Sequence, residues 1–195
     1  MKSFMLDIDG VLADWTGAYM HLAEVYYPGC SQGYHPTKQI EFASYNGVSL
    51  WDERVWDLLM KTDWWWTSLA PLVGQDVFHR IARMSRTYDV YFITNARHDT
   101  ISPVEQRATW LRTYGIPHPS VICTPLKGRI CDALKLDYAL EDRLENVQEI
   151  HKSSSTDAFL LDRPYNQSND SILFRRRVKT VMEFLDIMEN VWEWK

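Results

Sequence analysis

A short apolar stretch near the start of the chain runs directly into two closely spaced aspartates, and this feature constrains the fold most. Residues 4–14 read Phe-Met-Leu-Asp-Ile-Asp-Gly-Val-Leu-Ala-Asp. The apolar run is long enough for one buried strand, and residues two apart in a strand point to the same side. We therefore expect Asp7 and Asp9 to face one small volume at the end of that strand, where Gly10 lets the backbone turn sharply. In an open parallel sheet, ligands bind at this end of the strands.

The aspartate pair also limits the chemistry of this strand end. Two carboxylates held this close repel each other, and a bound cation or a shared proton relieves the repulsion. A calcium loop beginning at Asp7 would need a ligand residue at Val11 and a glutamate at Ala18, so the sequence excludes that motif. An ordinary turn does not usually follow a buried apolar run so directly, which favours a catalytic site.

Composition narrows the class of protein. The 195 residues favour one domain with an insert, and 46% hydrophobic residues can build a sizeable core. No apolar run is long enough to span a bilayer, and no signal peptide fits before the first strand. Three cysteines without metal-type spacing fit a reducing cytoplasm. The net charge of −5 argues against a protein that binds long nucleic acid, and the sequence leaves open whether a homodimer forms.

The order of the predicted elements indicates an α/β fold. From residue 74 onward, apolar strands alternate with amphipathic helices, which predicts a Rossmann-like parallel sheet with helices on both faces. About 80 residues separate Asp9 from Tyr88, whereas one crossover between parallel strands needs on the order of 30. The surplus is rich in tryptophan and predicts a small helical cap inserted after the first strand. We expect a core of residues 1–13 and 74–195 and a cap of residues 14–73.

Hydrophobic periodicity sets the expected boundaries of the elements. Residues 28–50 are rich in Gly, Pro, Ser and Asn and are expected to be irregular, with one helical turn near 38–43. The expected helices are 15–27, 50–61, 74–86, 103–114, 127–135, 144–152 and 178–192, and the expected later strands are 88–94, 120–124, 138–140 and 157–162.

The motif Asp-Ile-Asp-Gly-Val-Leu-Ala-Asp-Trp, residues 7–15, resembles the first motif of the haloacid dehalogenase superfamily of phosphohydrolases. More narrowly, it resembles the 5'(3')-deoxyribonucleotidases, in which an aromatic residue follows the same motif. The resemblance is strong over residues 4–15, recurs in pieces through the core, and is loose in the cap. It implies a phosphomonoesterase with the core and the cap expected above.

The resemblance assigns roles to the acidic residues. Asp7 is the expected nucleophile, which forms an aspartyl-phosphate, and Asp9 is the expected general acid and later the base that activates water. The expected metal is Mg²⁺, held by the carboxylates of Asp7 and Asp142 and the backbone carbonyl of Asp9. Glu141 stands where the deoxyribonucleotidases usually have aspartate, so its role stays open between ligand and supporting residue. Glu141 and Asp142 could also cap the following helix, which is compatible with metal binding.

The resemblance also implies groups that hold the phosphate. Thr94 ends a predicted strand where the family places a hydroxyl that donates to the phosphoryl oxygens. Lys127 resembles the family's cation beside phosphate and nucleophile, and Lys135, at the end of the same predicted helix, is its competitor. Further phosphate or substrate contacts are expected from Asn95, Arg97 and Arg143, although either arginine could be an ordinary surface charge.

Tryptophans in the cap are the candidates for choosing the substrate. Nucleotide bases and sugars bind well between aromatic faces. Trp15 stands where the deoxyribonucleotidases place an aromatic residue in the base pocket. Trp65 belongs to the run Trp64-Trp65-Trp66, of which one or two side chains are expected to reach the pocket. Without further evidence, any single tryptophan is expected to be buried in the core rather than to contact a substrate.

Together these features predict a Mg²⁺-dependent 5'-nucleotidase that acts on a small phosphorylated substrate, a (deoxy)nucleoside monophosphate, in the cytoplasm and without a membrane partner. One alternative is a polynucleotide 3'-phosphatase, which the segments 109–111 and 114–117 also resemble. The other is a non-catalytic binding module, because a fold alone does not prove an activity.

Overall fold

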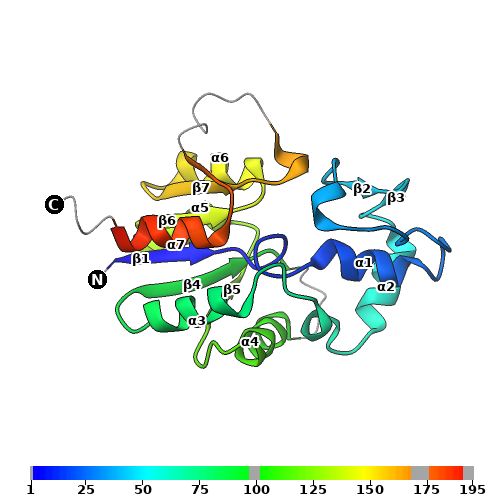
Figure 1. Ribbon diagram of the computed structural model, residues 1–195, viewed down its shortest axis with the longest axis horizontal. Helices are drawn as coiled ribbons and strands as arrows, with labels where there is room; N and C mark the ends of the chain where they lie inside the picture. The colour runs from blue at the N-terminus through cyan, green and yellow to red at the C-terminus, as the bar shows by residue number, and fades with distance from the viewer. Residues whose placement is uncertain (1, 97–101, 168–175, 191–195) are drawn as a thin grey trace.

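A six-stranded sheet in which every neighbouring pair of strands is parallel lies at the centre of the protein (Figure 1). The computed structural model describes residues 2–96, 102–167 and 176–190. The strands follow the order β5-β4-β1-β6-β7-β8. Their bounds are β1 (Ser3–Leu6), β4 (Asp89–Thr94), β5 (Ser120–Cys123), β6 (Tyr138–Glu141), β7 (Asp157–Leu161) and β8 (Arg177–Val178).

The first strand occupies the middle of this sheet. All four residues of β1 are buried, and the strand lies between β4 and β6, with Leu6 paired to Phe92 on one side and to Leu140 on the other. The strand order reverses direction at β1, because β4 and β5 lie on one side and β6 to β8 on the other. Such a reversal opens a crevice at the carboxyl ends of the strands, where ligands bind in open α/β sheets.

Helices cover both faces of the sheet, as the sequence predicted. Apolar residues of α3 (Gln75–Met84), α4 (Pro103–Thr113) and α7 (Val181–Asn190) belong to the larger buried cluster, which continues into the insert after β1. Residues of α5 (Lys127–Leu134) and α6 (Leu144–Ser153) form a smaller cluster with the opposite face of the sheet. No described helix has both the length and the apolar character needed to cross a membrane.

The segment between β1 and α3, called the cap below, lies beside the carboxyl end of the sheet, at the right of Figure 1. It contains α1 (Trp15–Ala23), the 3-10 turns η1 (Pro36–Lys38) and η2 (Trp65–Ser68), the short strands β2 (Ser44–Tyr45) and β3 (Val48–Ser49), and α2 (Glu53–Lys61).

The two linkers that enter and leave the cap are paired with each other. The Asp14 N–H donates to the Ala70 carbonyl over 2.8 Å, and the Leu72 N–H donates to the Leu12 carbonyl over 2.7 Å. A bridge between Ala13 and Pro71 lies between these two bonds. The chain therefore enters and leaves the cap at one narrow seam.

The insert also shows where the sequence-based boundaries were wrong. Residues 44–49 form a hairpin rather than an irregular segment, and Asn46 and Gly47 at its turn both have positive φ, as a tight hairpin turn requires. The helical turn covers Pro36–Lys38 rather than 38–43. The first helix ends at Ala23. Outside the insert, the last helix begins only at Val181, because residues 177 and 178 pair with β7 as an edge strand.

Candidate active site

Asp7 follows the central strand and is paired with a buried lysine. Lys127 is the first residue of α5, and its Nζ lies 2.8 Å from Asp7 Oδ2 and 2.5 Å from Glu141 Oε1. Burial alone would lower the pKa of Lys127, but the charges of Asp7 and Glu141 outweigh it and raise that pKa, so the lysine is a cation. Lys135, the competing candidate, is exposed and pairs with Asp132 at the other end of the helix.

Three buried carboxylates surround this ion pair. Oxygen atoms of Asp7, Glu141 and Asp142 all lie within 4.8 Å of one another. Both Glu141 oxygens are occupied, because Oε1 accepts from Lys127 and Oε2 accepts from Asn146 Nδ2 over 2.9 Å. Asp142 Oδ2 accepts from the Tyr165 hydroxyl, whereas Asp142 Oδ1 is buried without a partner among the described residues.

These donors fit a hard divalent cation. Burial, with the charge of Asp7 next, raises the pKa of Asp142 to about 6, and the same two effects raise the pKa of Glu141 well above its usual value. A bound cation would offset the repulsion among these buried carboxylates, and a ligand set made only of oxygen atoms suits Mg²⁺. The free Asp142 Oδ1 makes Asp142 a better candidate ligand than Glu141, whose oxygens are already engaged.

Gly10 leaves room for this cluster. Its φ is +85°, which favours glycine, and a Cβ atom there would lie 2.2 Å from Asp142 Oδ2. The Gly10 carbonyl accepts two hydrogen bonds from Arg163, over 3.0 and 2.8 Å from Nε and from the guanidinium end. The sharp turn after the aspartates is thus fixed both by the absence of a side chain and by a brace from the loop after β7.

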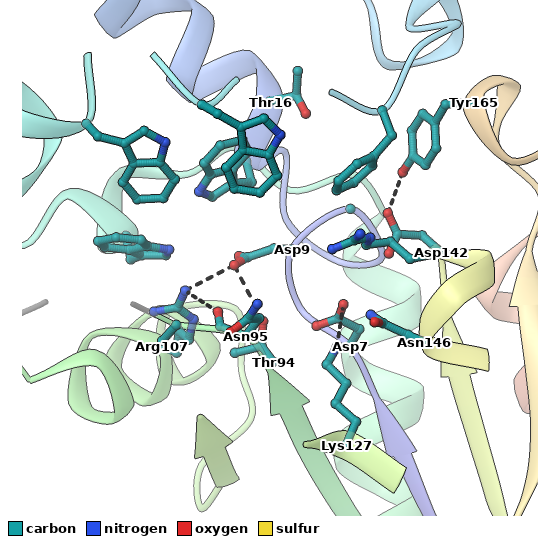
Figure 2. A pocket seen from close by; sticks show the side chains of 18 residues that line it. Asp7, Asp9, Thr16, Thr94, Asn95, Arg107, Lys127, Asp142, Asn146 and Tyr165 are labelled. Carbon is teal, nitrogen blue, oxygen red and sulfur yellow. Dashed lines mark hydrogen bonds and ion pairs between the residues drawn. The ribbon is translucent and has the colours of Figure 1, made fainter. Parts of the chain in front are cut away.

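Asp9 has a cation of its own (Figure 2). Its Oδ2 lies 3.0 Å from Arg107 of α4 and accepts a longer bond of 3.4 Å from Thr94 Oγ1. Burial raises the pKa of Asp9, the charge of Arg107 opposes this rise, and the charge of Asp7 adds to it. Sequence reasoning missed Arg107. The available signal was its position three residues before Trp110 and four before Leu111, on the buried stripe of the helix, where a charged residue is unusual.

A cavity of about 140 Å³ opens above these polar groups. Its floor comes from the core and includes every candidate catalytic residue named from the sequence, as well as Asn95 and Arg143. Its roof is aromatic and comes from the cap: Trp15, Phe42, Trp51, Trp56 and Trp66. A largely apolar cavity with a few convergent polar groups is typical of a site that binds a small molecule.

The structure corrects the choice among the three adjacent tryptophans. Trp66 lines the cavity and Trp65 does not. Trp65 is buried instead, with its ring edge-on to Trp66 at 4.9 Å and to Trp15 at 6.2 Å between centroids. The backbone N–H of Trp66 donates to Gln106 Oε1 over 3.2 Å, which anchors η2 on α4 and turns Trp66 toward the site.

Phe42 connects the cap to the floor at the rim of the cavity. The Arg143 guanidinium lies over its ring, and the Tyr165 ring meets it edge-on at 5.6 Å between centroids. Neither Phe42 nor Tyr165 was predicted, since both lie in segments without periodic pattern. Arg97, a predicted substrate contact, lies outside the described residues.

Solved structures with a similar fold include hydrolases of the haloacid dehalogenase type. One from Deinococcus radiodurans, with bound phosphate and sodium, has a TM-score of 0.61 at 14% identity and covers 97% of this chain and 95% of its own. A haloacid dehalogenase-like hydrolase from Burkholderia xenovorans has a TM-score of 0.59 at 10% identity, covering 99% and 98%. The D,D-heptose 1,7-bisphosphate phosphatase of Burkholderia thailandensis has a TM-score of 0.53 at 11% identity, covering 97% and 99%.

The fold that the chain shares with these hydrolases brings the acidic cluster to the carboxyl ends of β1 and β6. A search of curated proteins finds no match. A family model does match residues 2–188, and its description is "5' nucleotidase, deoxy (Pyrimidine), cytosolic type C protein". The chain belongs to this family and is a phosphoric monoester hydrolase.

Proposed function

We propose that the protein is a Mg²⁺-dependent 5'-nucleotidase that hydrolyses (deoxy)nucleoside monophosphates through an aspartyl-phosphate on Asp7. The observation that carries the proposal is the buried Lys127–Asp7 ion pair below a cavity with an aromatic roof. Family membership supports the same activity. We also propose the division into a core of residues 1–13 and 74–195 and a cap of residues 14–73, and a cytoplasmic location, with which the three free cysteines agree.

In the proposed mechanism, an Asp7 carboxylate oxygen attacks the phosphorus atom and the bond to the 5' oxygen breaks. Asp9 gives its proton to the departing oxygen, so the nucleoside leaves as a neutral alcohol. Asp9, now a carboxylate, then takes a proton from water, and that water attacks the phosphorus of the aspartyl-phosphate. Cleavage of the acyl phosphate releases inorganic phosphate, regenerates the Asp7 carboxylate and leaves Asp9 protonated again.

Other residues of the chain stabilise charge and orientation. Lys127 offsets the negative charge of the nucleophile and of the transferring phosphoryl group. Thr94 and the backbone at Asn95 provide hydrogen-bond donors for the phosphoryl oxygens. The carboxylates of Asp7 and Asp142 and the carbonyl of Asp9 would hold Mg²⁺, which supplies positive charge to the phosphate when bound. The aromatic roof, including Trp15 and Trp66, would cover the nucleoside and exclude water.

A substrate panel tests the proposal. Phosphate release is measured from ribo- and deoxyribonucleoside monophosphates and from a 3'-phosphorylated oligonucleotide, each with Mg²⁺ and with EDTA. We expect release from one or more mononucleotides that needs Mg²⁺ and is lost in Asp7→Asn. The exposed Asp132→Asn serves as the matched control and should keep full activity.

Other outcomes of the panel would contradict the proposal. Faster release from the oligonucleotide would favour the polynucleotide 3'-phosphatase. The absence of release from every compound would leave the non-catalytic binding module.

A further inference from the structure

The two aspartates of the opening motif form ion pairs with two different buried cations. Lys127 contacts Asp7, and Arg107 contacts Asp9. Arg107 is 1% exposed, although it lies on a helix whose other described arginine, Arg112, is largely exposed. A buried guanidinium is costly unless it is paired, so its position needs an explanation in terms of what it holds.

Arg107 is itself fixed from several sides. It donates to the Asn95 carbonyl over 3.2 Å and to the Pro103 carbonyl over 3.4 Å, and its Cζ lies 4.6 Å from the centre of the Trp66 ring. Trp66 is held in turn by Gln106, the neighbour of Arg107 in the chain. The guanidinium therefore has a defined place between α4, the end of β4 and the roof of the cavity (Figure 2).

The contacts of Asp9 are unequal at its two oxygens. Arg107 donates to Oδ2 over 3.0 Å, and the Thr94 hydroxyl, 3.4 Å away, donates to the same oxygen in the absence of a phosphate. Oδ1 is buried and has no partner among the described residues. The Arg107 bond to Oδ2 restrains the carboxyl group from turning. The other oxygen accepts no hydrogen bond from a described residue, so it can carry the proton that Asp9, at the wall of the cavity, passes to a substrate.

We infer that Arg107 is a positioning residue that holds Asp9 by Oδ2 and so keeps Oδ1 ready to protonate the leaving oxygen. This inference rests on the proposed function, because it needs Asp9 as the general acid. Two other roles for Arg107 are distinguishable from it. A purely structural arginine would affect every substrate alike, and an arginine that binds the phosphoryl group would do the same.

The test compares two substrates that differ in one bridging atom. The first is the nucleoside 5'-monophosphate that the wild-type enzyme hydrolyses best, and the second is its analogue with sulfur in place of the bridging 5' oxygen. A thiolate departs readily without a proton, whereas an alkoxide needs one. The kcat/KM value reports only the steps up to departure of the leaving group, so later hydrolysis of the aspartyl-phosphate does not affect the comparison.

We expect Arg107→Met to lower kcat/KM on the oxygen ester by roughly 10- to 100-fold, part of the contribution that general acid catalysis usually makes. On the sulfur analogue, kcat/KM should change by less than about threefold. Arg107→Lys, which keeps a cation and guards against a folding defect in the methionine variant, should show the same selectivity with a smaller loss. Arg112→Met, on the exposed side of the same helix, should leave both values unchanged.

Equal losses on the two substrates in an active, folded variant would overturn the inference and leave the proposed function intact. A wild-type enzyme that hydrolyses neither compound would overturn the proposed function, and the inference with it.

Discussion

The Cζ atom of Arg143 lies 4.1 Å from the centre of the Phe42 ring, so a side chain of the cap stacks on the residue that follows the candidate metal ligand Asp142. Phe42 also lines the cavity and meets Tyr165. Its ring is therefore placed to cover a substrate on one face while it contacts the core on the other.

Replacement of Phe42 should weaken substrate binding more than it slows the reaction. We expect Phe42→Ala to raise KM for the best nucleotide about three- to tenfold, as the loss of roughly 1 kcal/mol of aromatic contact implies, with kcat within about threefold. Steady-state kinetics measures both values. Ile40→Ala, two residues away and 76% exposed, is the control and should behave as wild type. An unchanged KM in Phe42→Ala would remove Phe42 from the substrate pocket.

Loss of the lysine cation should cost stability as well as activity. In Lys127→Met, Asp7 and Glu141 stay buried without their partner, and breaking such a pair costs about 3–5 kcal/mol. Chemical denaturation in EDTA measures the free energy of unfolding. The double variant Lys127→Met/Glu141→Gln should recover part of that free energy but no activity, because the nucleophile still lacks its cation. A double variant as unstable as the single one would contradict this account.

Mg²⁺ should stabilise the folded protein through Asp142. Binding to the native state alone adds about 2.7 kcal/mol at a concentration 100 times the Kd, which corresponds to roughly 5–10 °C in Tm at this chain length. We expect this shift in thermal unfolding of the wild type, its reversal by EDTA, and its loss in Asp142→Asn. The exposed Asp132→Asn should keep the full shift. A shift of equal size in both variants would place the ion elsewhere.

Gly10 and Gly29 allow the effect of a Cβ atom to be separated from the effect of backbone conformation. Both have φ near +85°, but a Cβ atom at Gly29 would meet nothing within 4 Å, whereas at Gly10 it would collide with Asp142. Gly29→Ala should cost about 1–2 kcal/mol of unfolding free energy from conformation alone. Gly10→Ala should cost about 1–3 kcal/mol more and should also weaken the Mg²⁺ shift. Equal costs at the two positions would contradict the close approach of Gly10 to the acidic cluster.

An ion pair between α3 and α7 should give stability a pH dependence far from the active site. Hydrogen bonds from Arg80 hold the pKa of Glu189 below its usual value, with Arg80 Nη2 2.7 Å from Glu189 Oε2. A lowered pKa in the folded state means that the contribution is complete above the unfolded pKa of about 4.3 and is lost as the pH falls.

Glu189→Gln should therefore lower the free energy of unfolding by about 0.5 kcal/mol at pH 7, a small value because the pair is partly exposed to solvent. The difference from wild type should decrease as the pH falls below the unfolded pKa of about 4.3 and disappear once Glu189 is protonated in the folded state as well. Chemical denaturation of both proteins across this pH range measures the difference in the free energy of unfolding. A difference that does not change with pH would show that the pair contributes through packing alone.

The residues that the sequence predicted best are those whose position follows from local pattern. The apolar run and the aspartate spacing place Asp7 at the end of a buried strand, and a lysine at the start of a helix after a neighbouring strand reaches the same edge of the sheet. This position favours Lys127 over its competitor Lys135, and the structure places Lys127, not Lys135, against Asp7.

Features that depend on contacts between distant segments were missed. In the helix Pro103–Thr113, the apolar Val104 is 44% exposed and the charged Arg107 is buried. Asp9, the ion-pair partner that offsets the energetic cost of burying Arg107, is 98 residues away in the chain, so no local pattern reveals it. The choice between Trp65 and Trp66 failed for a similar reason, because it depends on how η2 docks on α4 through Gln106.

The narrow seam between Leu12–Asp14 and Ala70–Leu72 has a consequence for any opening of the site. The linker that leaves the cap is tied to the core beyond this seam, because the Trp66 backbone donates to Gln106 and the Trp110 indole donates to the Leu69 carbonyl over 2.8 Å. The linker that enters the cap is bonded to the same segment through Asp14. Any opening would therefore keep the Trp66 side of the cavity fixed beside Arg107, and only the earlier part of the cap, with Trp15 and Phe42, could move away from it.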